Sequence, residues 1–486
     1  MPMRNSPIIP FPVPFSWIKA ACLLLLLLVG IASSWQTLYA QEPLPQLVKD
    51  INPQGDSYPG NFVATDQALF FVARNSAAER ELWKSDGTTA GTVLVKHVEN
   101  GIIRPGLSVL NNIVYFGVEK SNPIQFELWR SDGTATGTFR LKTINSTGSS
   151  GGVEGIVVGN SLLFVASDGI HGQEWWRTDG TEAGTQLVKD INSRNEEFIL
   201  GPQDSLVLNN NLFFFEFYTD GKFGLWRTDG SDAGTTLIRE FTGINGQWQK
   251  EPFAFANTLY FFIRDQAGAN YLWKSDGTTD GTTEVTKLDP HNGNAPMATF
   301  PTIVGSTIFF QVGDLPGIGT FCELWQSDGT AAETSYLANV CPRYSMSELN
   351  GKLYFFPERV EGQEVAMQLW QSDGTPTGTK IVKQIGAGRN GYPSHLQNLG
   401  NLLYFSGIDN EHGRELWRSE GTEASTLLLK DIQPNSQSGL DRDMGGFYPW
   451  KTNFFFAATD GTTGIELWAM EYITYSHFVH LPLITR

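Results

Sequence analysis

Short apolar runs alternate with polar turn residues along most of the chain. In one unit the runs are NFVATDQ at 61–67, ALFFVAR at 68–74, RELWKS at 80–85 and TVLVKHV at 92–98. Each run is rich in aromatic and β-branched residues, and turn residues bound it, which is typical of short β-strands. No segment after residue 40 shows sustained helical periodicity. The pattern therefore predicts an all-β protein.

This four-strand pattern is repeated, and each copy is marked by a tryptophan in its third run. The segment ELWKSDGTTAGT at 81–92 returns as ELWRSDGTATGT, as EWWRTDGTEAGT and as five further variants, and a ninth copy stops after ELWAMEY at 466–472. The marker tryptophans are 45 to 52 residues apart, at Trp83, Trp129, Trp176, Trp226, Trp273, Trp325, Trp370, Trp417 and Trp468. This spacing fits four short strands and their turns.

The two ends of the chain supply complementary parts of one unit. The last copy has only three strand-like runs, whereas LVKDIN at 47–52 matches a fourth run, LVKDIN at 187–192. An N-terminal strand that completes the last unit leaves no open sheet edge, which favours a closed ring over a linear stack. The sequence thus predicts a closed β-propeller of four-stranded antiparallel blades over residues 44–472. It has nine repeats, and one irregular repeat would reduce the number to eight blades.

The SDGT segment predicts the turn between the third and fourth strands of each blade. Asp accepts hydrogen bonds from backbone N–H groups two residues on, Gly adopts a left-handed conformation, and Thr supplies hydroxyls. We assign a structural role to the turn aspartates Asp86, Asp132, Asp179, Asp229, Asp276, Asp328 and Asp373. Glu81 and Lys96, with equivalent pairs in other copies, are 15 residues apart, and we expect them to face each other across this hairpin.

The first 40 residues differ in composition from the rest of the chain. They carry only Arg4 and Lys19 as charged residues, followed by an apolar run at 20–32 and small residues. The run is shorter than the roughly 20 residues of a spanning helix, and the pattern is typical of a secretory signal peptide. We expect a signal peptide at 1–40, the propeller at 41–472 and a short tail at 473–486, with no transmembrane segment in the mature chain and a location outside the cell or at its surface.

Charge and cysteine content fit an exported protein. Removal of residues 1–40 leaves 32 basic and 51 acidic residues, a net charge of −19 that repels nucleic acid and anionic membranes. Two cysteines remain, Cys322 and Cys341, on either side of the turn of one repeat. An oxidising compartment permits a disulfide between them, although the hairpin register places them diagonally, near the limit of disulfide geometry. Two buried free thiols are the alternative.

The repeats resemble those of the ELWxxDGT family of exported bacterial proteins, and eight full copies with one partial copy cover nearly all of the mature chain. This resemblance implies a secreted repeat protein and carries no settled biochemical activity. The turn is also similar to the Asp-box of sialidases and other propellers, but Ser85-Asp86-Gly87 lacks the spacer residues of that box. Asp-boxes are structural and lie away from catalytic centres, in agreement with the turn assignment.

Candidate ligand-binding residues lie where the chain enters each blade. In a propeller the uniform turns occupy one face, and the variable blade-to-blade connections occupy the other, where recognition is expected. A proline lies 24 residues before the marker tryptophan in five copies and marks the entry to the innermost strand. The candidates next to these prolines and their equivalents are Tyr58, Arg104, Trp248, Glu251, Phe300, Tyr392, Tyr448 and Trp450. The alternative is that the rings only pack the blade entrances.

Motifs for catalysis are absent from the sequence. There is no HExxH, no GxSxG and no phosphate loop, and each SDGT turn offers one carboxylate where a metal site concentrates several. We therefore predict no cofactor, no metal and no catalytic residue. The leading hypothesis is a secreted or cell-surface, monomeric, non-enzymatic scaffold that binds an extracellular glycan or protein.

Two other functions remain open from the sequence. The first is a glycan-cleaving enzyme, sialidase-like or lyase-like, that uses carboxylates such as Glu251 or Asp441. A cluster of three arginines would favour a sialidase-like site, and only Arg104 among the residues before the prolines fits such a cluster. The second is a purely structural component of the cell envelope.

Overall fold

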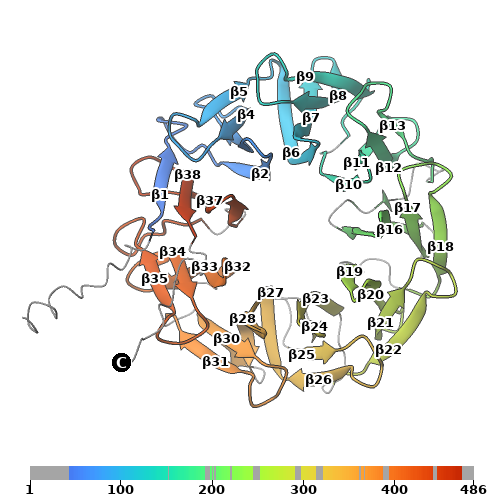
Figure 1. Cartoon of the computed structure of the whole chain (residues 1–486), viewed down its shortest axis with the longest axis vertical. Coiled ribbons are helices and arrows are strands. Elements are labelled where there is room, and N and C mark those ends of the chain that lie inside the picture. Colours follow the sequence, from blue (N-terminus) through green and yellow to red (C-terminus); the bar gives the residue numbers. More distant parts are fainter. Residues whose placement is uncertain are drawn as a thin grey trace, which may run out of the picture. The chain divides into compact units, whose positions relative to one another are not determined.

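The computed structural model describes residues 43–150, 153–191, 198–199, 201, 204–218, 222–244, 252–290, 297–313, 321–360, 363–365, 367–386, 393–441 and 446–472. Nine antiparallel sheets form the unit that begins at Leu44, and they follow one another around a ring as the blades of a β-propeller (Figure 1). Among the described residues, no helix has the length and apolar character needed to cross a membrane.

Within blades 1 to 8 the chain runs from the innermost strand to the outermost one. Blades 1 to 3 contain β2 (Gly60–Ala64), β3 (Leu69–Arg74), β4 (Arg80–Ser85), β5 (Val93–Lys96); β6 (Gly101–Leu110), β7 (Ile113–Ser121), β8 (Ile124–Ser131), β9 (Phe139–Asn145); β10 (Gly155–Val158), β11 (Ser161–Ser167), β12 (Gln173–Thr178) and β13 (Gln186–Leu187). Blades 4 to 6 contain β14 (Phe198–Ile199), β15 (Leu206–Leu208), β16 (Asn211–Phe217), β17 (Phe223–Thr228), β18 (Thr236–Phe241); β19 (Phe253–Phe255), β20 (Thr258–Arg264), β21 (Asn270–Ser275), β22 (Thr283–Leu288); β23 (Met297–Val304), β24 (Thr307–Gly313), β25 (Cys322–Ser327) and β26 (Ser335–Ala338). Blades 7 to 9 contain β27 (Val340–Leu349), β28 (Lys352–Val360), β29 (Gln363–Glu364), β30 (Gln368–Ser372), β31 (Lys380–Gln384); β32 (Ser394–Leu399), β33 (Leu402–Asp409), β34 (Gly413–Ser419), β35 (Leu427–Lys430); β36 (Tyr448–Trp450), β37 (Asn453–Ala458), β38 (Glu466–Glu471) and β1 (Gln46–Lys49).

The N-terminal strand β1 is the outermost strand of blade 9. It pairs antiparallel with β38, so that Leu47 lies opposite Trp468, and Figure 1 shows the two strands side by side. The Lys430 ammonium of blade 8 donates a hydrogen bond of 2.9 Å to the Pro45 carbonyl, which ties the same segment to the preceding blade. The predicted nine-bladed fold is confirmed, and its last blade is built from both ends of the chain.

The core lies between neighbouring blades, and both faces of each sheet are covered. On β3, Phe70 and Val72 pack toward blade 2, whereas Leu69 and Phe71 pack toward blade 9. This arrangement explains why the second strand of each unit is a continuous apolar run instead of an alternating one, since side chains of both parities are buried.

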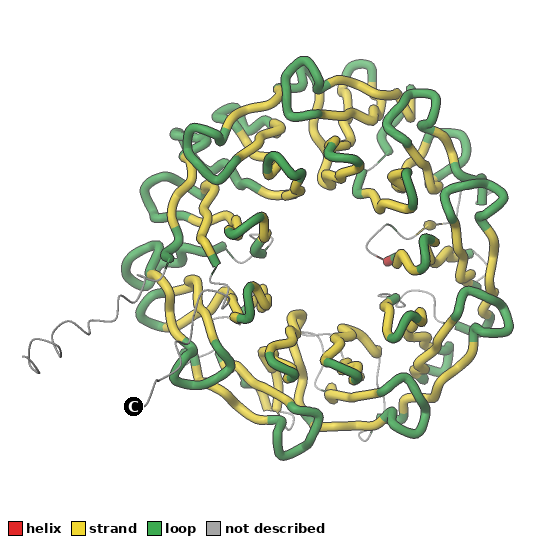
Figure 2. Tube along the Cα trace, viewed as in Figure 1, coloured by secondary structure: helices red, strands yellow, loops and turns green. Residues whose placement is uncertain are grey.

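The SDGT turn is held by hydrogen bonds within the motif. The Asp86 Oδ1 atom accepts from the backbone N–H of Thr88 at 2.9 Å and from its hydroxyl at 2.7 Å, and these bonds lower the pKa of Asp86. Gly87 adopts a φ of 92°, and a Cβ at Gly91 would overlap the Asp86 carboxylate. Figure 2 shows these turns as loops around the outside of the ring. Steric fit and hydrogen bonding therefore favour Asp, Gly and Thr at these positions of the turn.

In blades 2 to 5 the same turn also joins the blade to the one before it. Lys84 donates a hydrogen bond of 2.8 Å to the carbonyl of Gly133, which is the turn glycine of blade 2. Equivalent bonds run from Arg130 to Gly180, from Arg177 to Gly230 and from Arg227 to Gly277. The basic residue after the marker tryptophan is thus a link between blades.

The predicted pairing of Glu81 with Lys96 is wrong. A β-bulge between Leu82 and Trp83 shifts the register by one residue, so that Lys96 lies opposite Leu82. The same bulge places Lys142 opposite Leu128 and Lys430 opposite Leu416. The glutamates are buried instead of exposed, with Glu81 only 5 % exposed.

The buried glutamates hold the connections between blades. The Glu415 Oε2 atom accepts from the Ile432 N–H at 2.9 Å, and Oε1 accepts from the Gly439 N–H at 2.7 Å. Glu466 accepts from the Ile51 N–H at 2.7 Å in the same way, across the ring closure. Burial raises the pKa of both Glu415 and Glu466 to about 7, because the charged carboxylate loses its hydration.

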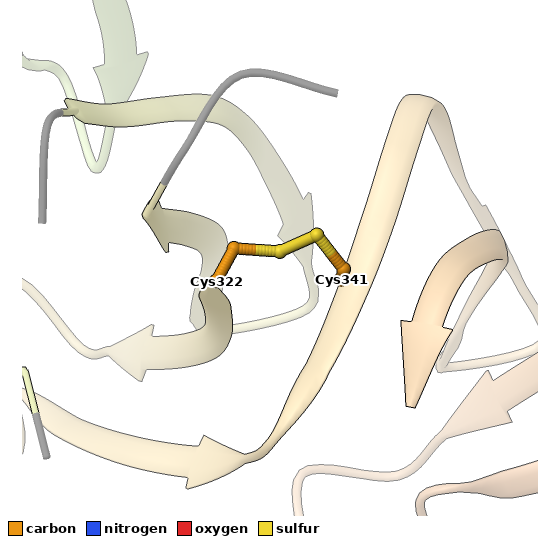
Figure 3. The surroundings of a disulfide bond; sticks show 2 residues. All are labelled: Cys322 and Cys341. Carbon is orange, nitrogen blue, oxygen red and sulfur yellow. A yellow bond between two sulfur atoms is a disulfide. The ribbon is translucent and has the colours of Figure 1, made fainter. Parts of the chain in front are cut away.

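A disulfide joins Cys322 to Cys341 (Figure 3), with a Cα–Cα distance of 5.2 Å. Cys322 begins β25 in blade 6, whereas Cys341 lies on β27, the first strand of blade 7. The bond therefore links two neighbouring blades. The sequence had suggested a bond across a single hairpin.

The turn of blade 8 leads to a prediction about the motif, because this blade has Glu420 in place of Asp and Ser425 in place of Gly. The Ser425 hydroxyl bonds to the Thr422 N–H at 3.2 Å and to its hydroxyl at 2.7 Å, as the Asp carboxylate does elsewhere. We expect Gly91→Ser alone to lower the free energy of unfolding by about 1–3 kcal/mol through overpacking. Adding Asp86→Glu should recover at least about 0.5 kcal/mol.

Denaturant unfolding of both single variants and the double variant would measure this coupling. Blade 6 shows how a turn accepts a side chain at the position of Gly91, because Glu333 lies there while Asp328 is retained. The Glu333 N–H lies 3.4 Å from the Thr330 hydroxyl, whereas the Gly91 N–H lies 3.0 Å from the Thr88 hydroxyl. If the effects of the two substitutions on the free energy of unfolding were additive, the serine hydroxyl would not replace the aspartate carboxylate, and the prediction would be wrong.

The disulfide should contribute measurably to stability. It closes a segment with a sequence separation of 19 residues, which corresponds to about 3 kcal/mol in the chain-entropy treatment. We expect the double variant Cys322→Ala, Cys341→Ala to unfold at a lower denaturant concentration than the oxidised protein. The reduced wild-type chain is the control, and equal midpoints for all three forms would show that the bond contributes nothing.

The buried glutamates predict a loss of stability as the pH rises. Their pKa is about 4.5 when unfolded and about 7 when folded, so the stabilisation is complete below about pH 4.5 and is lost as the pH rises through about 7. For each group this difference corresponds to about 3 kcal/mol. The unfolding free energy of Glu415→Gln should therefore decline less than that of the wild type between pH 5 and pH 8. Glu423→Gln, at an exposed turn position, removes the same charge and should keep the wild-type decline.

Candidate functional site

The entries to the innermost strands and the turns between second and third strands lie at the same end of each antiparallel sheet. We call this end of the propeller the loop face. Of the predicted ligand-binding residues, Trp248, Glu251 and Tyr392 lie outside the described residues. The structure places the other five at three different locations.

Two of these five residues lie in the boundary between blade 9 and blade 1. Trp450 ends β36, away from the loop face; it is 8 % exposed, and its indole N–H donates to the Thr65 carbonyl at 3.0 Å. The Tyr448 ring is half-buried, 5.9 Å from the ring of Phe62, and burial raises its pKa. Both rings pack between blades, which is the alternative that the sequence left open.

Phe300 lies on the innermost strand of blade 6. It has a φ of 57° at a β-bulge of β23, between Thr299 and Thr302, and its side chain is half-buried. No other predicted candidate is brought next to it among the described residues.

Tyr58 is the most exposed of the described candidates, at 46 %. Its position is fixed by the neighbouring Ser57, whose carbonyl accepts from the Arg74 N–H at 2.7 Å and whose hydroxyl donates to Glu466 at 2.7 Å. The Arg74 guanidinium lies over the Tyr58 ring, 5.1 Å from its centroid. A hydrogen bond to Asp56 raises the pKa of the Tyr58 phenol. An exposed aromatic ring is thus held on a rigid support.

Two further arginines lie next to Arg74. Arg80 is the direct cross-strand partner of Arg74 on β3 and β4. Arg74 lies two residues after Val72 on β3, and Arg80 lies two residues before Leu82 on β4. Val72 and Leu82 pack toward blade 2, so the alternation of a strand points both arginines toward that blade. Arg104 comes from β6 of blade 2, with its Nε atom 3.3 Å from the Glu119 carboxylate.

The three arginines are close enough to interact electrostatically. Burial and then the positive charges of Arg74 and Arg104 lower the pKa of Arg80. We call Arg74, Arg80 and Arg104 the arginine cluster; it lies at the boundary of blades 1 and 2 on the loop face. Sequence reasoning found Tyr58 and Arg104 but missed Arg74 and Arg80, whose proximity depends on strand pairing.

Two histidines on the loop face have a local structural role. The Nδ1 atom of His171 lies 2.7 Å from Asp168, and that of His412 lies 2.9 Å from Asp409, within equivalent turns of blades 3 and 8. Each bond to a carboxylate raises the pKa of the imidazole. Across the part of the chain that the structure describes, no group of three or more His, Cys, Asp or Glu residues is arranged to hold a metal ion.

The fold and the loop face define a nine-bladed β-propeller with an exposed tyrosine and three arginines at one blade boundary. No family model and no curated protein matches the chain. Solved structures with a similar fold include a puromycin hydrolase (10 % identity, TM-score 0.39), which covers 75 % of this chain and 61 % of the hydrolase. The similarity to prolyl oligopeptidase B from Galerina marginata (10 % identity, TM-score 0.39) covers 82 % of this chain and 55 % of the oligopeptidase chain.

A third similar structure is the acylaminoacyl peptidase from Pyrococcus horikoshii, with 13 % identity, a TM-score of 0.34 and coverage of 82 % of this chain and 57 % of the peptidase. The chain therefore spans less than two thirds of the length of each of these proteins. Similarity at these values concerns the fold and carries no argument about activity.

Proposed function

We propose that this chain is an exported, non-enzymatic member of the ELWxxDGT-repeat proteins that binds an extracellular glycan or protein through its loop face. The observation that carries the proposal is the exposed Tyr58 ring beside the arginine cluster. Aromatic rings with a few convergent polar groups are typical of binding sites on rigid scaffolds. The composition of residues 1–40 supports export.

Rigidity at Tyr58 supports recognition by a preformed site. The ring is attached to a segment that Glu466 holds through Ser57, and Glu466 lies on the strand that closes the ring. A side chain held in this way loses little conformational entropy when a ligand binds, which favours affinity. The uniform turns on the opposite end serve the scaffold, so variation between blades is concentrated where a ligand would bind.

A glycan-cleaving enzyme is the second candidate, and the arginine cluster is the observation that favours it. The three arginines lie near one another, as a sialidase-like site would need, and the Asp441 charge adds to the hydrogen bond with Asp56 that raises the pKa of Tyr58. Such an enzyme also needs two carboxylates about 5 to 9.5 Å apart on the two sides of a bound sugar. Glu251, the other carboxylate considered, lies outside the described residues.

A glycan and polysaccharide binding screen of the purified chain tests both candidates. It is run with and without calcium, and every glycan that binds is then analysed for new reducing ends. Tyr58→Ala should weaken binding about tenfold or more, in line with the loss of one central aromatic contact. Trp450→Phe, at the buried blade boundary, is the control and should leave the affinity unchanged once its folding has been checked.

Release of new reducing ends that is lost in Asp441→Asn would replace the binding proposal with the enzymatic one. Failure to bind any glycan or extracellular protein would overturn both and favour a structural envelope component. A calcium requirement is not expected, because no described residues form a cluster suited to that ion.

A further inference from the structure

Arg74 and Arg80 form an unfavourable pair in the sheet. They are direct cross-strand neighbours on β3 and β4, and like charges placed directly opposite each other destabilise a sheet. Neither side chain forms an ion pair or a side-chain hydrogen bond with any residue in the described part of the chain, and the Arg74 guanidinium lies over the Tyr58 ring. The charge of Arg104 adds to the repulsion, and burial together with the charges of Arg74 and Arg104 lowers the pKa of Arg80. Stability alone does not account for this arrangement.

The other blades show what the scaffold uses at the position of Arg80, three residues before the marker tryptophan. Several blades fill it with a buried side chain, as at Phe126, Phe223, Cys322 and Met367. Blade 8 has Arg414 there, but this arginine is buried and donates to the Ser406 hydroxyl at 3.2 Å. Blade 1 is therefore a departure from the repeat in which the charge has no compensating partner of its own.

We propose that the arginine cluster binds the anionic group, a carboxylate or a sulfate, of an acidic polysaccharide, whose sugar ring lies against Tyr58. Guanidinium groups bind such anions through paired, charge-assisted hydrogen bonds, and an anion also removes the repulsion between Arg74 and Arg80. The inference rests on the proposed glycan-binding function and adds the class of glycan and the residues that select it.

The charge of the whole chain favours a localised site. The sequence has a net charge of −17, so most of the surface repels a polyanion. Arg104 is partly neutralised by Glu119, and Asp56 and Asp441 approach the phenol of Tyr58. Binding is therefore expected to involve one or two anionic groups, and its affinity should fall when the salt concentration rises.

The test measures binding of polygalacturonate, dextran sulfate and neutral dextran to the purified chain by isothermal titration calorimetry. The wild type should bind one or both polyanions and not dextran, and comparison of the two identifies carboxylate or sulfate as the preferred group. Arg80→Met, which introduces the residue found in blade 7, should weaken binding about tenfold or more through the loss of charged hydrogen bonds. Its melting temperature without ligand should equal or exceed that of the wild type.

The matched control is Arg264→Met. Arg264 has the position of Arg74 in blade 5, but its cross-strand partner is Asn270 and not a second arginine. This variant removes the same charge and should keep wild-type affinity, which separates the cluster from the net charge. A lower melting temperature for Arg80→Met would show that Arg80 is part of the scaffold and would overturn the inference.

Two further outcomes separate this inference from the proposed function. If the screen finds a neutral glycan or a protein ligand whose affinity depends on Tyr58 and is the same in Arg80→Met, the anion site is refuted and the binding function stands. If Arg80→Met and Arg264→Met weaken polyanion binding equally, the interaction depends on net charge and the arginine cluster is not a site.

Discussion

The hydrogen-bonded contact between Asp and Thr in the SDGT turn is the interaction on which the other features depend. The Asp86 carboxylate accepts two bonds from Thr88 and occupies the space where a side chain at residue 91 would lie. This fixes the turn, and the fixed turn presents a glycine carbonyl to the basic side chain of the preceding blade, as from Lys84 to Gly133. One local geometry thus both closes each outer hairpin and positions its neighbour, which explains why the chain repeats the motif almost unchanged.

The ninth blade shows what happens where the motif is missing. Its outer strand comes from the N-terminus, so no turn connects β38 to β1, and β1 joins the blade by pairing antiparallel with β38. Glu466 binds the Ile51 N–H, and Lys430 binds the Pro45 carbonyl. The closure therefore combines the β1–β38 pairing with the kind of glutamate contact that Glu415 makes in blade 8, and it holds the segment that carries Tyr58. Ring closure and the candidate site are consequently connected through a few residues.

Periodicity predicted the fold because the repeat length, the turn residues and the incomplete last copy each constrain the topology. The register of the outer hairpin was not predictable, since the bulge at Leu82 and Trp83 leaves no mark in the apolar pattern. The site was found in part: Tyr58 and Arg104 are adjacent to prolines, whereas Arg74 and Arg80 become neighbours only through strand pairing. Comparing equivalent positions relative to the marker tryptophan would have pointed to Arg80 and Arg414, because these two copies carry arginine where several others carry an apolar residue.

Departures from a repeat differ in whether the molecule compensates for them. In blade 8, Glu420 and Ser425 replace Asp and Gly together, and the Ser425 hydroxyl takes over the hydrogen bonds of the missing carboxylate. The hydrogen bonds lost in that departure are replaced within the turn itself, so it requires no ligand. At Arg80 the charge faces a second arginine, and the structure supplies no ion pair within the described residues. An uncompensated charge that faces a second arginine on the loop face is the feature of this chain that most directly indicates an external partner.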